Sequence, residues 1–281
     1  MKNNQVNNPL KNLTLGQKTN YSSDYSPELL QAVPRSLNRE EFNIGDEQLF
    51  KGSDTWNAYE LSWLNLKGKP EVGLARFVFD AKSPNIVESK SFKLYLNSFN
   101  QTCFESIDIV VNKMVEDLSN VSGHKVKVEL FSAFQNEPFV INELPGQCID
   151  VLDISVDNFE LNPSVLTVEP EGEIVEETLH SHLLKSNCLI TNQPDWASVI
   201  IRYKGAKIDP EKLLKYLISF RMHNEFHEQC VERIFIDVSR ACQTEMLSVQ
   251  ALYTRRGGLD INPYRHSGIW EEAPYYRINR Q

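Results

Sequence analysis

A five-residue pattern that occurs twice limits what this chain can fold into. Tyr95-Leu96-Asn97-Ser98-Phe99 returns as Tyr216-Leu217-Ile218-Ser219-Phe220, at an offset of 216 − 95 = 121 residues, and an aromatic residue and an acid soon follow each copy. Two extended segments precede each copy, and a helical pattern and a further extended segment follow it. This order predicts a tandem duplication of a strand-strand-helix-helix-strand module.

In the first half, partial alternation of apolar and polar residues predicts a β-hairpin over residues 59–66 and 72–79. Apolar residues at three- and four-residue steps predict a helix over 107–118 that ends at Gly123, and alternation over 126–130 predicts a strand. Residues 25–39 are partly apolar and carry no recognisable chemistry.

The second half shows the same succession of patterns. Extended runs over 174–184 and 198–203 precede Asp209-Pro210, a helix N-cap followed by proline at the first helical position. An apolar stripe over 226–238 predicts a helix, and we expect the strand over 247–253 to close the module.

Composition narrows the class of ligand. The chain has 281 residues, 41% of them hydrophobic, and a formal net charge of −9. Nucleic acids and anionic membranes are bound through clustered Lys and Arg, which this chain lacks, so a small-molecule ligand is favoured. The first twenty residues are rich in Asn and Lys without an apolar core, which indicates a surface arm and neither a signal peptide nor a membrane span.

The cysteines indicate a reducing compartment. Five of them, at positions 103, 148, 188, 230 and 242, form an odd set without a CxxC pair. This spacing argues against a disulfide framework and against a zinc ribbon, and a cytoplasmic location fits it.

Three residues could carry covalent chemistry. Cys188 precedes Asp195 by seven residues in what we expect to be an ordered turn leading into a strand, and His227 lies on the later apolar helical face. A thiol, an acid and an imidazole are the parts of a nucleophilic mechanism. Taken alone, a single cysteine is more often a small buried hydrophobe, and a histidine on an apolar helical face is more often a core residue.

Four motifs together give the chain a family resemblance. They are Glu88 to Tyr95, Cys188 to Asp195, Ser219-Phe220-Arg221 to Cys230, and Arg255-Arg256-Gly257-Gly258. In this order they resemble the NADPH-dependent 7-cyano-7-deazaguanine reductases, the nitrile reductases of queuosine biosynthesis, in their long two-domain type.

The resemblance implies an α+β architecture of tandem tunnelling-fold modules, in which antiparallel β-sheets are backed by helices. We expect an arm and lead-in over residues 1–55, an N-terminal module over 56–150 and a C-terminal module over 151–281. The resemblance also implies a cytoplasmic homodimer that binds neither nucleic acid nor membrane.

The family chemistry gives each residue a role. Cys188 is implied to be the thiolate that adds to the nitrile carbon, Asp195 the acid that protonates the resulting thioimide nitrogen, and His227 a proton relay. Because Asp195 must be protonated for part of the cycle, we expect burial near Trp196 to raise its pKa.

Substrate and cofactor residues follow in the same way. A 7-deazaguanine presents N–H donors along one edge, which carboxylates can accept, so Glu228 and Glu88 are implied substrate ligands. The full implied substrate set is Val87, Glu88, Ser89, His227 and Glu228. Without its motif, Glu88 would be read as an exposed acid at a strand end. Two NADPH per turnover are implied at Ser89, Lys90, Arg256 and Gly257, with no metal; no Rossmann GxGxxG follows a strand.

Two other classes of protein stay open. A zinc-dependent cyclohydrolase on the same fold would use Cys188 and a histidine as ligands, but a third ligand at suitable spacing is missing. A purine- or pterin-binding module would keep Glu228 and Glu88 and lack the covalent step.

Overall fold

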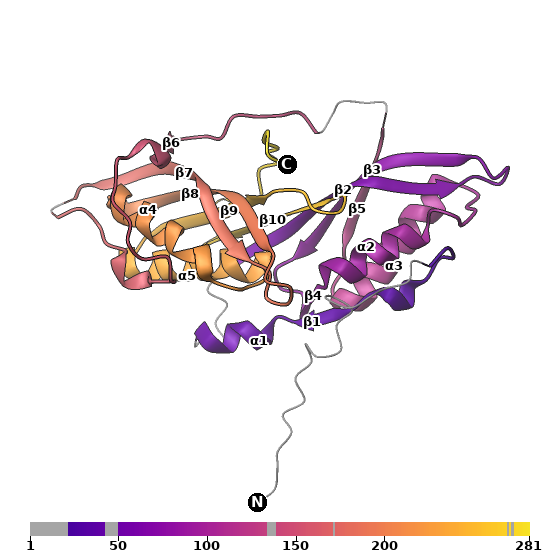
Figure 1. Cartoon of the computed structure of the whole chain (residues 1–281), viewed down its shortest axis with the longest axis horizontal. Coiled ribbons are helices and arrows are strands. Elements are labelled where there is room, and N and C mark those ends of the chain that lie inside the picture. The colour runs from indigo at the N-terminus through magenta and orange to yellow at the C-terminus, as the bar shows by residue number, and fades with distance from the viewer. Residues whose placement is uncertain (1–21, 43–49, 134–138, 171, 269, 271–272) are drawn as a thin grey trace, which may run out of the picture.

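Eight strands from both halves of the chain form one continuous sheet (Figure 1). The structure is a computed structural model that describes residues 22–42, 50–133, 139–170, 172–268, 270 and 273–281. The strand order is β5-β3-β2-β10-β9-β8-β7-β6, and neighbours are antiparallel except for the parallel pair β6 and β7. The strands span β2 (Lys51–Leu64), β3 (Pro70–Asp80), β5 (Lys127–Ser132), β6 (Gln147–Cys148), β7 (Ile174–Asn187), β8 (Pro194–Ala206), β9 (Met246–Tyr253) and β10 (Leu259–His266).

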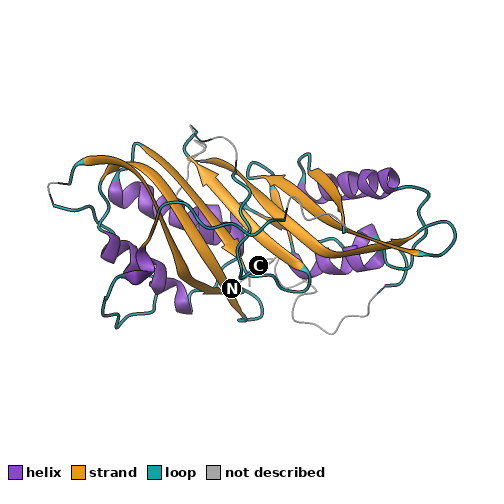
Figure 2. Cartoon of the chain, turned by 90° about the horizontal axis from the view of Figure 1, so that it is seen from above, coloured by secondary structure: helices purple, strands orange, loops and turns teal. Residues whose placement is uncertain are grey.

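Two pairs of helices lie under one face of this sheet (Figures 1 and 2). They are α2 (Ser89–Ser98) and α3 (Ile107–Ser122) in the first half, and α4 (Pro210–Ile218) and α5 (His227–Cys242) in the second. The short elements are β1 (Ala32–Pro34), α1 (Ser36–Arg39), β4 (Asn85–Val87) and five 3-10 helices (Pro27–Leu29, Glu40–Phe42, Ile149–Val151, Pro163–Val165 and Ser219–Met222). The predicted α+β class, with antiparallel strands backed by helices, is confirmed.

Local sequence explains where the helices begin and end. The Asp209 side chain accepts hydrogen bonds from two backbone N–H groups in the first turn of α4, at 3.0 and 3.1 Å. Gly123 follows α3 in the left-handed conformation, at φ 74°, which glycine adopts without steric cost. Both predicted signals are confirmed.

The two halves repeat each other in detail. The β2–β3 hairpin has a register shift between Ala58 and Leu61, and β7–β8 has one between Ser181 and Leu184. In both copies of the repeated pentapeptide the serine hydroxyl donates to the tyrosine carbonyl at 2.6 Å. The halves therefore share packing as well as element order.

Strand β10 joins the halves and was not predicted. It pairs with β9 on one side and with β2 on the other, so the expectation that the strand over 247–253 closes the module is wrong. Pro263 lies in the middle of β10 opposite Asp54, and all eight residues of the strand are buried. Proline and buried polar residues argue against a central strand in a sequence, which is why the pattern was missed.

Buried charges stabilise the junction between the halves. Arg265 on β10 pairs with Asp54 on β2 and with Glu232 on α5, both at 2.8 Å. Arg35 reaches Asp54 at 2.5 Å and Arg39 reaches Glu232 at 2.6 Å. The segment over residues 25–39, in which we predicted no chemistry, thus ties both modules together.

We propose that the chain divides as predicted, into residues 1–55, 56–150 and 151–281. Two large hydrophobic clusters support this division, one built mainly from β2, β3, α2 and α3 and the other from β7 to β9, α4 and α5. β2 begins at Lys51, a few residues before the proposed boundary. The predicted arm over the first twenty residues lies outside the described residues.

Candidate active site

One cavity lies where the two modules meet, and it collects residues from both. Its empty volume, which includes open solvent at the mouth, is about 680 Å³. The lining comprises Trp56, Ile86, Val87, Ser89, Lys93, Cys188, Asp195, Glu225, Phe226, His227, Glu228, Tyr253, Thr254, Arg256, Leu259 and Ile261. Six of the predicted substrate and catalytic residues are in this set, together with Arg256.

Cys188 is the first residue of the turn between β7 and β8. Its backbone N–H donates to the Gln193 carbonyl at 2.8 Å, and its carbonyl accepts from Asn192 N–H at 3.0 Å. The Asn224 side-chain amide also donates to this carbonyl, at 3.3 Å. Because Asn224 lies just ahead of α5, these bonds hold the thiol, which is 9% exposed, beside the start of that helix. The predicted ordered turn is confirmed.

Asp195 lies on β8 between Arg256 and His227. Arg256 donates to its carboxylate, and His227 Nε2 is 3.6 Å from Asp195 Oδ1. Burial alone would raise the pKa of Asp195, but the hydrogen bonds and charges of His227 and Arg256 outweigh burial and lower the pKa below its usual value. The predicted rise in this pKa is therefore wrong, because its cationic neighbours come from distant parts of the chain.

The pKa of Glu228 is shifted in the opposite direction to that of Asp195. It is 3% exposed at the start of α5, and its side chain accepts no hydrogen bond from another side chain of the described residues. Burial, followed by the negative charge of Asp54, raises the pKa of Glu228 to about 7. A buried acid that lines a cavity without such a partner is suited to a ligand that supplies the missing donors.

Glu88 is fully buried, but its carboxylate forms hydrogen bonds within its own helix start. It caps α2 by accepting hydrogen bonds from the backbone N–H groups of Lys90 and Ser91, both at 2.7 Å. Its neighbours Val87 and Ser89 line the cavity, whereas Glu88 and Lys90 are absent from the lining. Glu88 as a substrate ligand stays a prediction.

Lys93 is the main residue that sequence reasoning missed. It lines the cavity one helical turn after Ser89, and its pKa is lowered by burial first and then by the charge of Arg256. Gly257, at φ 56°, lies against its side chain, since a Cβ there would be 3.1 Å from Lys93 Cδ. The Ser89 to Lys93 spacing of four residues, within a motif already singled out, was the available signal.

Aromatic rings form the apolar walls. Tyr253 at the end of β9 meets the His227 ring edge to face, with ring centroids 4.2 Å apart, and Trp56 and Phe226 complete the lining. Trp56 comes from β2, some 170 residues from His227, and no local pattern could place it here. Phe226 was predicted as part of a core stripe.

Comparison with known proteins identifies the family. Residues 21–130 match the family model described as "Nitrile reductase, 7-cyano-7-deazaguanine-reductase N-term", and residues 194–271 match the model described as "QueF-like protein". The crystal structure of the archaeosine synthase QueF-Like in the apo form is similar over 36% of this chain and 96% of its own, at 20% identity and a TM-score of 0.30. The chain belongs to the 7-cyano-7-deazaguanine reductase family of nitrile reductases and matches its two-domain type.

No helix among the described residues is long and apolar enough to span a membrane.

Proposed function

We propose that this protein reduces the nitrile of 7-cyano-7-deazaguanine to the primary amine of 7-aminomethyl-7-deazaguanine, in queuosine biosynthesis, with two NADPH per turnover. One observation carries the proposal: Cys188, Asp195, His227 and Glu228 line a single cavity although they come from three separate elements. A thiol, a proton-carrying pair and a buried carboxylate that accepts no hydrogen bond from another side chain of the described residues are what covalent capture of a cyano-substituted base requires.

The first step forms a covalent thioimide. The Cys188 sulfur bonds to the nitrile carbon, the carbon–nitrogen triple bond becomes a double bond, and the nitrogen takes one proton. Because His227 and Arg256 hold Asp195 ionised, the His227 imidazole beside it is the member of the pair that carries the proton to the nitrogen. His227 takes this proton from the Cys188 thiol, and the Asp195 carboxylate stabilises the transient imidazolium and fixes its orientation until the proton passes to the nitrogen.

Glu228 supplies recognition of the heterocycle in this proposal. Its carboxylate accepts N–H donors along one edge of the deazapurine, while Phe226, Trp56 and Tyr253 contact the rings. We propose Val87, Ser89 and Glu88 on the opposite wall, and at the adjoining start of α2, as further substrate contacts.

The cationic side of the cavity fits an anionic cosubstrate. Burial lowers the pKa of Lys93, and the nearby charge of Arg256 lowers it further, so an anion between these two side chains would relieve their repulsion. We propose that Ser89, Lys90, Lys93, Arg256 and Gly257 hold NADPH. When bound, NADPH supplies hydride, and two hydrides with two protons convert the nitrile to the amine. One hydride and one proton convert the thioimide to a thiohemiaminal, whose carbon–sulfur bond breaks to return the Cys188 thiolate and leave a protonated imine. The second hydride reduces this imine to the amine.

We also propose that the protein is a cytoplasmic homodimer. All five cysteines are free thiols, which matches a reducing compartment. Among the described residues the sheet has two edge strands, β5 and β6. Edge strands can pair with a second copy of the chain, as the family resemblance implies.

The test begins without NADPH. Mixing the protein with the nitrile should give a covalent adduct on Cys188, detected by intact-protein and peptide mass spectrometry. Addition of NADPH should then release the amine with two equivalents oxidised. A protein that binds the base reversibly and forms no adduct would be a binding module, and the proposal would fail.

A further inference from the structure

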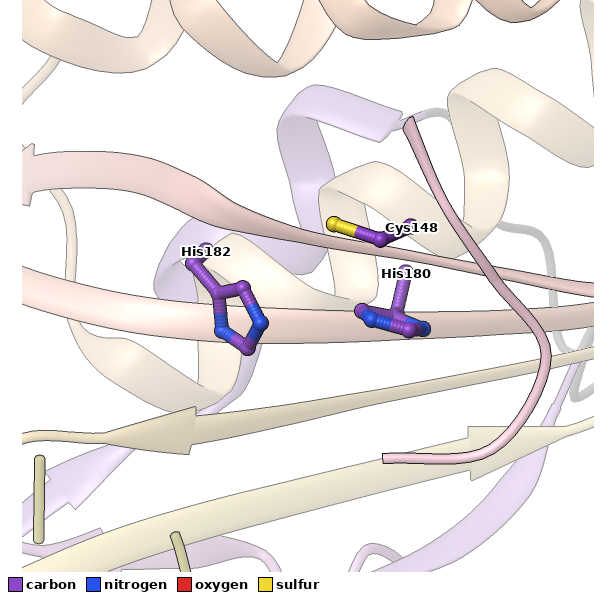
Figure 3. A group of neighbouring side chains, drawn as sticks. All are labelled: Cys148, His180 and His182. Atoms are coloured by element: carbon purple, nitrogen blue, oxygen red, sulfur yellow. The ribbon is translucent and has the colours of Figure 1, made fainter. Parts of the chain in front are cut away.

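A second group of reactive side chains lies outside the catalytic cavity (Figure 3). Cys148 on β6 pairs directly with His180 on β7, and His182 follows two residues along the same strand. Their ligand atoms, one thiol sulfur and one ring nitrogen from each histidine, all lie within 4.8 Å of one another. Cys148 and His180 are partners across a parallel strand pair, so their nearness follows from the strand register.

Neighbouring groups orient both imidazoles. His180 Nδ1 is 2.9 Å from the Pro145 carbonyl, and His182 Nδ1 is 2.7 Å from Ser198 Oγ. With each Nδ1 engaged, Nε2 is the nitrogen left for a metal, and such outer hydrogen bonds typically fix the rings of metal-binding histidines. Asp150 holds the strand between them, since it accepts from Ser181 Oγ at 2.5 Å and from His182 N–H at 2.7 Å.

We propose that Cys148, His180 and His182 bind one Zn²⁺ ion. One thiolate and two imidazoles form a three-ligand set of the kind that zinc takes, with a fourth position for water or a carboxylate. The group borders a second cavity, which Glu143 and Arg280 also line, so the fourth position faces solvent or Glu143. The family function leaves these three residues without a role.

Zinc binding requires the three ligand atoms to move only slightly closer together. Zinc bonds of roughly 2.1 Å to nitrogen and 2.3 Å to sulfur place ligand atoms about 3.5 Å apart. Ligand atoms up to 4.8 Å apart reach that spacing when side-chain rotations move them by about 1 Å. Such a shift lies within ordinary rotamer adjustment.

The position of the site gives the ion a structural role. β6 lies just before the proposed boundary between the two modules, and its described contact in the sheet is the two-residue ladder with β7. A metal bound across this ladder fastens the boundary segment to the second module. Since the ion binds the folded chain and not the unfolded one, it should raise the melting temperature.

The experiment uses the full chain, stripped with a chelator and titrated with Co²⁺ and then Zn²⁺. Wild type should bind one equivalent, show a near-ultraviolet thiolate-to-cobalt band, and melt about 5 °C higher with zinc at 100 times its Kd. Cys148→Ser should lose the band, and Cys148→Ser and His180→Gln should each weaken binding at least tenfold. Cys103→Ser and His124→Gln, which alter an exposed cysteine and an exposed histidine, are the matched controls.

Three outcomes would overturn the proposal. They are the absence of stoichiometric binding by wild type, equal binding by Cys148→Ser and Cys103→Ser, and loss of the band in Cys188→Ser but not in Cys148→Ser. The last result would place the metal in the catalytic cavity. If the variants fail to fold, protection of the Cys148 thiol in wild type decides the matter. Zinc should slow its alkylation, as mapped by peptide mass spectrometry, and an unchanged rate would refute the site.

Discussion

The two modules share their internal packing and differ at equivalent ends, of which only the one in the second module lines the catalytic cavity. In the first, the Tyr95 hydroxyl donates to Asp117 at 2.7 Å, and in the second the Tyr216 hydroxyl donates to Asp237 at the same distance. These pairs join the two helices of each module. A duplicated module can keep such helix-to-helix bonds while its loop and terminal residues change.

The helix starts show the change most clearly. α3 begins at Ile107, which is 46% exposed, whereas α5 begins at His227, which lines the catalytic cavity. The turn after β2 starts with Asn65, while the turn after β7 starts with Cys188. The predicted catalytic residues therefore lie on the second copy, at the end that β2 and β10 enclose.

Removing the thiol tests this asymmetry with the largest expected effect. Cys188→Ala should lower turnover by about 10⁴-fold or more, since no other group can form the covalent bond, and should leave reversible base binding. Cys103→Ala, in the first module, should leave turnover unchanged. Steady-state oxidation of NADPH measures turnover of each variant, and calorimetry measures its binding of the base. A Cys188→Ala protein that still reduces the nitrile would remove the covalent mechanism.

The junction between the modules should be more sensitive than either outer surface. Glu232→Ala removes the buried carboxylate that Arg39 pairs with and one of the two that pair with Arg265, and should cost about 3–5 kcal/mol. Glu176→Ala breaks an exposed pair with Arg202 and should cost less than about 1 kcal/mol. Urea unfolding measures both. Similar losses in the two variants would show that the buried network does not join the modules.

Local patterns predicted most of this fold, and long-range pairing explains the rest. Hairpins, helix caps and the repeat follow from neighbours in sequence, so the segments over 59–79 and 107–130 were predictable. β10 was missed because Pro263 and buried charges argue against a central strand. The pKa of Asp195 was predicted in the wrong direction because Arg256, 61 residues later, is its partner.

The site was predictable where a motif carried it. Cys188, Asp195, His227 and Glu228 were predicted from residue type and family resemblance together, and all four line the cavity. Lys93 was missed although it lies inside the first motif, since its burial depends on Gly257 and Arg256. Trp56 and the Arg35 network come from segments whose sequences resemble ordinary strand and surface positions.

The two acids Glu225 and Glu228 should respond to pH in opposite directions. Folding raises the pKa of Glu228 to about 7, so this acid favours the fold below its usual pKa and loses that contribution as pH rises through 7. Glu228→Gln should therefore stabilise the protein at pH 8 by up to about 3 kcal/mol and change little at pH 4.5. Thermal melts at the two pH values measure this difference.

Glu225→Gln is the matched comparison. Burial alone would raise the pKa of Glu225, but its pairs with His223 and Arg233 lower it. Its contribution is present above the usual pKa and lost as pH falls, so this variant should destabilise the protein at pH 8. A Glu228→Gln variant that is no more stable than wild type at pH 8 would show that folding does not raise the pKa of Glu228.

The equivalent caps Glu88 and Asp209 give the finest test of how the modules differ. They lie 121 residues apart, the offset of the repeat, and each accepts two backbone N–H groups at the start of α2 or α4. Glu88→Gln and Asp209→Asn should each cost about 1 kcal/mol as weakened caps. Only Glu88→Gln should also weaken binding of the base, by roughly tenfold, because a lost charge-assisted hydrogen bond is worth about 1.5 kcal/mol or more. Calorimetry with the nitrile measures this difference. Equal binding by the two variants would reduce Glu88 to a helix cap and leave Glu228 as the carboxylate that recognises the substrate.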